Sequence, residues 1–82
     1  MTEEQIKEIE DFYTDSCAMV SISEDKAKKH YFQGEAMGVY VLLDMLGYTV
    51  KEDGVKVKYL PNIAKSIECK HYKVVKRLSY ED

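Results

Sequence analysis

The segment from Ala27 to Leu46 most constrains the fold, because apolar side chains cover well over half of its helical wheel. Eight residues form the centre of this apolar surface: Ala27, Tyr31, Gly34, Gly38, Val41, Leu42, Met45 and Leu46. A surface helix of a globular protein has an apolar stripe on one side only. We therefore expect a long central helix with packing partners on two sides.

Capping signals set the expected ends of this helix. Ser23 before Glu24 and Asp25 is a good N-cap. Gly47 follows the last periodic residue and is expected to be the glycine that ends the helix. Gly34 leaves open a break into two shorter helices.

An amphipathic helix is expected over residues 3–20. Thr2 and Gln5 have the spacing of a capping box. Ile6, Ile9 and Tyr13 lie on its apolar stripe, and acidic side chains cover most of the opposite side.

The hydrophobic period changes from 3.6 to 2 after Gly47. Alternation around the turn signal that ends in Gly54 predicts a β-hairpin with strands at 48–51 and 55–60 and a positive φ at Gly54. Pro61 and Asn62 are expected to start an amphipathic C-terminal helix, whose apolar stripe runs from Ile63 to Leu78. The expected fold is a single α+β domain over residues 1–82, in the order α-α-β-β-α, with the hairpin and the C-terminal helix packed on the central helix.

The composition excludes several classes of protein. With 45% hydrophobic and 33% charged residues, the 82-residue chain resembles a soluble globular domain and not a disordered one. The most apolar run, Val39 to Leu43, is too short to span a bilayer. Two cysteines without a signal peptide fit a reducing compartment, so we expect a cytoplasmic protein in a bacterium or in a cell that a phage or mobile element occupies.

No residue pattern predicts catalysis, a cofactor or a metal site. On the expected C-terminal helix, Cys69 and His71 would point to opposite sides and could not bind one ion. No cysteine or serine is marked as a nucleophile on a tight turn. We therefore expect a protein that is not an enzyme.

The net charge of −3 is unevenly distributed. Residues 1–25 carry eight acids and one base, whereas residues 51–82 carry eight bases and five acids. The predicted partner-binding residues are the acids Glu4, Glu8, Asp11 and Asp15, which would meet a basic surface on another protein.

Small acidic proteins of phages and mobile elements that block host defence nucleases are similar in size and charge. An inhibitor of a nucleic-acid-handling protein is therefore the main hypothesis. In the alternative interpretation, the acidic and basic faces are only solvated and attract each other within the fold.

A second hypothesis is nucleic-acid binding by the basic face of the C-terminal helix. That face would carry Lys65, Lys70, Lys73, Lys76 and Arg77. Arg77 is the only arginine in the chain, although base reading usually depends on arginine. Self-association remains a third option, because seven tyrosines and four methionines are many for a chain of this size.

Overall fold

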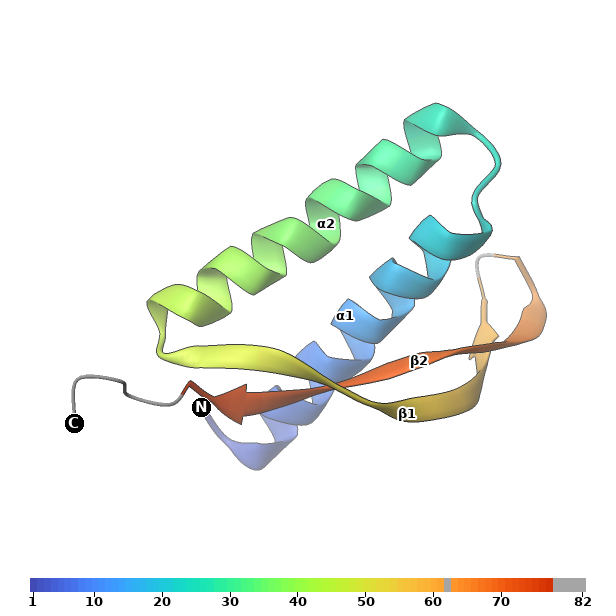
Figure 1. Cartoon of the computed structure of the whole chain (residues 1–82). Helices are drawn as coiled ribbons and strands as arrows, with labels where there is room; N and C mark the ends of the chain where they lie inside the picture. The colour runs from blue at the N-terminus through green and yellow to red at the C-terminus, as the bar shows by residue number, and fades with distance from the viewer. Residues whose placement is uncertain (62, 78–82) are drawn as a thin grey trace.

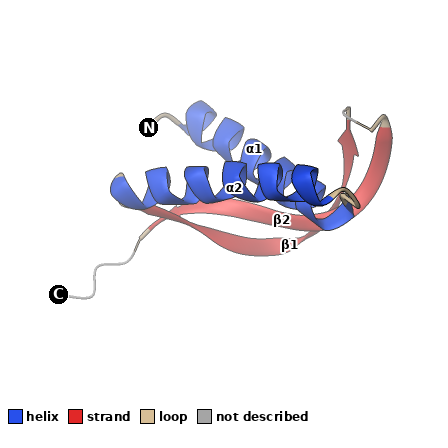
Figure 2. Cartoon of the chain, turned by 90° about the horizontal axis from the view of Figure 1, so that it is seen from above, coloured by secondary structure: helices blue, strands red, loops and turns tan. Residues whose placement is uncertain are grey.

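Two helices cover one side of a two-stranded antiparallel sheet in the computed structural model (Figures 1 and 2), which describes residues 1–61 and 63–77. The elements follow in the order α1 (Glu3–Ile22), α2 (Lys26–Met45), β1 (Tyr48–Leu60) and β2 (Lys65–Lys76). The fold is therefore α+β, as the sequence predicts, but its order is α-α-β-β.

The local signals of α1 are confirmed, and the boundary before α2 differs from the prediction. Thr2 and Gln5 form the complete capping box. Ser23 ends α1 instead of starting α2, because its backbone N–H donates to the carbonyl of Met19. Asp25 is the N-cap of α2 and accepts a hydrogen bond from the N–H of Ala27 at 2.9 Å. Asp25 has the same capping chemistry as Ser23 and lies directly before the first helical residue.

Helix α2 continues without a break through Gly34. It ends at Met45, and Gly47 after its C-cap Leu46 has a φ of 87°, the left-handed conformation expected of a terminal glycine. The two helices run antiparallel to each other and make up the first half of the chain (Figure 1).

The predicted hairpin within residues 48–60 is wrong. Residues on both sides of Gly54 belong to the single strand β1, and the register with β2 shifts between Glu52 and Val55. Gly54 does have the expected positive φ, 80°, but it lies at a β-bulge and not at a chain reversal. A bulge inserts an extra residue and bends a strand without ending its pairing, so the same turn residues are compatible with both structures.

The predicted C-terminal helix is also wrong, because residues Lys65–Lys76 form β2 and pair with β1. The chain reverses through a turn after Leu60, in which Ala64 has a φ of 51°. Ile67, Cys69 and His71 are partly buried, and the residue before each of them is exposed, which is the period of a strand. Asn62 and Leu78, the ends of the predicted helix, lie outside the described residues.

Helix α1 contributes more buried residues than α2, although α2 also packs against two elements, α1 and β1. Helix α1 packs against both α2 and β2, and its residues Ala18 and Met19 form a core cluster with Leu60 of β1. Helix α2 contributes Ala36 and Leu43 to the buried residues. Because the last segment is a strand and not a helix, nothing within the described residues covers the opposite side of α2.

Candidate functional site

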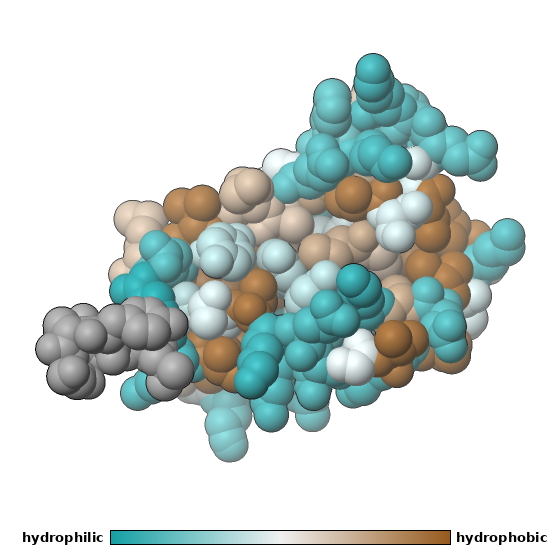
Figure 3. All heavy atoms as spheres, viewed as in Figure 1, coloured by the Kyte–Doolittle hydropathy of each residue, from teal (hydrophilic) through white to brown (hydrophobic). Residues whose placement is uncertain are grey.

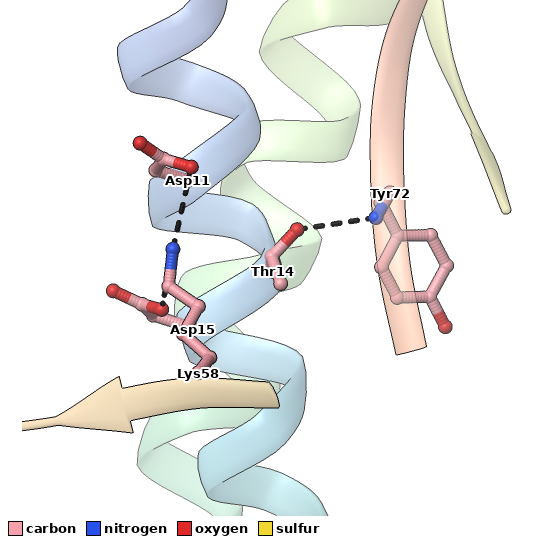
Figure 4. A network of polar contacts seen from close by, with 5 residues as sticks. All are labelled: Asp11, Thr14, Asp15, Lys58 and Tyr72. Carbon is pink, nitrogen blue, oxygen red and sulfur yellow. Dashed lines mark hydrogen bonds and ion pairs between the residues drawn. The ribbon is translucent and has the colours of Figure 1, made fainter. Parts of the chain in front are cut away.

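The structure divides the four predicted acidic binding residues into two pairs. Glu4 and Glu8 are exposed on the first half of α1. Asp11 and Asp15 both lie 3.3 Å from Nζ of Lys58, which reaches them from β1 (Figure 4). Half of the predicted site therefore forms an ion-pair network within the fold. For Asp11 and Asp15, this agrees with the alternative interpretation, in which the acidic and basic residues attract each other within the fold.

Burial and charge act in opposite directions on Lys58. Partial burial alone would lower its pKa, but the contacts with Asp11 and Asp15 outweigh burial and raise the pKa above 10.5. The side chain of Lys58 is only 24% exposed, so water weakens its ion pairs less than it weakens those of a fully exposed lysine. This network ties β1 to α1.

Two more polar side chains of α1 hold the outer edge of β2, and sequence reasoning missed both. Thr14 Oγ1 accepts a hydrogen bond from the N–H of Tyr72 at 3.2 Å (Figure 4), and Glu10 accepts one from the N–H of Val74 at 2.8 Å. The edge of a sheet otherwise presents unpaired N–H groups to other chains. Helix α1 therefore provides acceptors for two N–H groups on the outer edge of β2, those of Tyr72 and Val74.

An aromatic contact lies beside this edge, where the rings of Tyr13 and Tyr72 meet edge to face with centroids 5.2 Å apart. Burial, and then the neighbouring Cys17, raises the pKa of Tyr13 to about 12. The pKa of Cys17 is itself raised, mainly by burial, so its reactive thiolate form is disfavoured.

The raised pKa of Tyr13 predicts a loss of stability at alkaline pH. Because the folded state holds this proton more tightly than the unfolded state, whose tyrosine pKa is 10.0, stability is retained below pH 10 and falls between pH 10 and about 12. Urea denaturation at pH 8 and pH 11 should show this fall, and the fall should be smaller in Tyr13→Phe. An equal fall in both proteins would contradict the assignment to Tyr13.

The lysines predicted to form one basic face do not share a face. On the strand β2, alternation places Lys65 and Lys73 on one side of the sheet and Lys70 and Lys76 on the other. Lys70 lies 3.7 Å from Glu52, and the guanidinium of Arg77 pairs with the carboxylate of Asp44 at the end of α2. The basic helix on which the nucleic-acid hypothesis depends is absent, since these residues form a strand and the coil that follows it.

Because residues 65–76 form a strand, Cys69 and His71 lie on the same side of β2, two residues apart. The expectation that they point in opposite directions is wrong. His71 Nδ1 lies 3.8 Å from a carboxylate oxygen of Asp53. Among residues 1–61 and 63–77, no group of three or more His, Cys, Asp or Glu side chains is arranged to hold a metal ion.

An open groove of about 920 Å³ separates α2 from α1 and the sheet. Its walls are mostly apolar and include Cys17 of α1, Met37 and Tyr40 of α2, and Ile67 and Tyr72 of β2.

The largest unexplained feature is the outer side of α2. Six exposed residues follow one another at spacings of four and three, and we call them the α2 seam: Ala27, Tyr31, Gly34, Gly38, Val41 and Met45. Tyr31 is 65% exposed, Val41 49% and Met45 77%, and Leu42 beside them is 57% exposed. Figure 3 shows hydrophilic side chains at the N-terminal end of α2 and hydrophobic ones over its C-terminal half. Alternating spacings of three and four are those of residues that face a partner helix in a coiled coil.

Neither of the two helices that the structure describes is long and apolar enough to cross a membrane. Comparison of the chain with known proteins finds no matching family model, no matching curated protein and no matching solved structure.

Proposed function

We propose that this chain is a protein-binding module and that it binds its partner with the α2 seam. The observation that supports the proposal is the exposure of the seam, in which Tyr31, Val41 and Met45 lie in one row along a 20-residue helix. Soluble proteins rarely expose large contiguous apolar surfaces, and those that do usually use them to bind other proteins or ligands. Covering this row with another protein would remove its apolar surface from water.

The shape of the surface favours a helical partner. The seam is a ridge along a straight helix, and the side opposite to it packs inward through Ala36 and Leu43. A helix laid against this ridge would meet an apolar side chain or a glycine at every turn.

The acidic residues have a narrower role in this proposal than the sequence suggested. Glu4 and Glu8 are the predicted binding acids without an ion pair among the residues described, so they can attract a basic partner without disturbing the fold. The hypothesis of an inhibitor of a nucleic-acid-handling protein depends on this attraction. It predicts that Glu4→Lys with Glu8→Lys slows association by about tenfold at low salt, because complementary charge acts mainly on the association rate.

Site-specific photo-cross-linking tests the proposal without knowledge of the partner. Benzophenone-bearing phenylalanine is placed at Leu42, beside the seam, and in a control chain at Val57 of β1, which is 72% exposed. Irradiation of the producing cells should give a protein adduct from position 42 and not from position 57. Mass spectrometry of the adduct then identifies the bound protein.

The adduct from position 42 should also disappear when Val41→Lys is added. No adduct from position 42, or the same adduct from both positions, would contradict the assignment of the seam as the binding surface.

A further inference from the structure

We infer that the partner on the α2 seam is a second copy of this chain, bound with its α2 antiparallel to the first. This inference rests on the proposed function and names the occupant of the same surface. A helix pairs with an antiparallel copy of itself about a two-fold axis, so each contact occurs twice. The residues of the surface must then match those of its own reversed sequence.

The spacing of the seam has this property. Read from either end, its residues follow at intervals of four, three, four, three and four. Reversing one copy therefore places Ala27 opposite Met45, Tyr31 opposite Val41 and Gly34 opposite Gly38. The two outer pairs, Ala27 with Met45 and Tyr31 with Val41, each combine a larger with a smaller side chain, which lets the facing side chains interlock.

The two glycines lie at the centre of this arrangement. A Cβ atom added to Gly34 or Gly38 would meet no atom within 4 Å, so no close contact within the folded chain requires glycine at either position. Glycine in the middle of a helix is destabilising unless a backbone or a ligand approaches closely. In the antiparallel pair, the two helices cross at these residues, and the missing side chains let the backbones approach.

The charges of α2 specify the antiparallel direction. Lys26 and Lys28 are exposed near its first turn, whereas the acid Asp44 is exposed in its last turn. Asp44 remains 56% exposed beside its ion pair with Arg77. An antiparallel pair brings the basic end of each copy to the end of the other that carries Asp44, and it also opposes the two helix dipoles. A parallel pair would bring like charges together.

The first test measures the mass of the purified chain by light scattering and by sedimentation over a dilution series. The wild type should have twice the monomer mass of 9.5 kDa at high concentration. Val41→Lys should raise the dimer dissociation constant by about 100-fold or more, because the symmetric contact would bury two unpaired ammonium groups. Val57→Lys makes the same chemical change at an exposed valine of β1 and should leave the dimer intact.

The second test establishes the direction of the helices by disulfide formation in a Cys17→Ser, Cys69→Ser background. In the antiparallel register, positions 31 and 41 of different copies face each other, whereas the two copies of position 31 are about 15 Å apart along the helix. A disulfide needs Cα atoms within about 7 Å. An equimolar mixture of Tyr31→Cys and Val41→Cys should therefore cross-link, and Tyr31→Cys alone should not.

These outcomes separate the inference from the proposed function. A monomeric wild type at all concentrations, or cross-linking of Tyr31→Cys with itself, overturns the antiparallel dimer. If the photo-adduct from position 42 then contains a different protein, the seam still binds protein. A dimer that Val57→Lys dissociates and Val41→Lys does not would overturn both, because the contact would lie on the sheet.

Discussion

Replacing Leu43 with alanine is expected to lower the free energy of unfolding by about 3 kcal/mol. Leu43 is only 1% exposed and is the most buried hydrophobic residue of those that the structure describes. Truncating a buried leucine loses its transfer free energy and leaves a cavity that the surroundings fill only in part. Because only six hydrophobic side chains are buried among the described residues, little else can compensate. The midpoint of thermal unfolding should fall by roughly 10–20 °C.

Leu42→Ala is the matched control, because Leu42 is the preceding residue of the same helix and is 57% exposed. Both substitutions are compared in the Val41→Lys background, so that a contact between two copies does not contribute. We expect Leu42→Ala to change stability by at most about 0.5 kcal/mol there. A larger loss from Leu42→Ala than from Leu43→Ala would mean that the opposite side of α2 faces the core.

The helical half of the fold was predictable because its signals are local. The capping box of Thr2 and Gln5 and the terminal glycine Gly47 act within one helical turn, and both appear as expected. The boundary error at Ser23 has a local cause too, since Ser23 and Asp25 are both good N-caps and only one can precede the first helical residue.

The C-terminal half was not predictable in the same way. The segment from Ile67 to Val75 contains apolar residues at helical spacing, and its first residues also alternate at the spacing of a strand. The pairing of β2 with β1 decides between the two structures, and this pairing joins residues up to 28 positions apart, from Tyr48 to Lys76. The bulge at Gly54 lets β1 continue where a turn was expected.

The candidate site was partly visible in the sequence. Periodicity identified the seam residues, such as Val41 and Met45, as the centre of a broad apolar surface. It could not show that this side stays exposed, because that depends on what the last segment forms. The role of Glu10 was hidden for a related reason: a carboxylate that accepts a hydrogen bond from the distant Val74 N–H has the same sequence signature as a solvated one.

The clearest test of the contact between α1 and β2 is Thr14→Val, which keeps the shape of the side chain and removes the hydroxyl. Thr14 is 1% exposed, and its Oγ1 is the acceptor for the N–H of Tyr72. A buried donor without an acceptor costs about 1–3 kcal/mol, so Thr14→Val should lose that much stability.

Thr14→Ser keeps the hydroxyl and loses only a methyl group, so it should be more stable than Thr14→Val even though it is smaller. Hydrogen exchange supplies an internal control, because the amide of Val74 is held by Glu10 and not by Thr14. In Thr14→Val, the amide of Tyr72 should exchange faster relative to that of Val74, since a lost hydrogen bond opens its own amide whereas a general loss of stability speeds both. If both amides accelerate equally, or if Thr14→Val is as stable as the wild type, Thr14 does not hold the edge of the sheet, and β2 would need another way to satisfy the N–H groups that face away from β1.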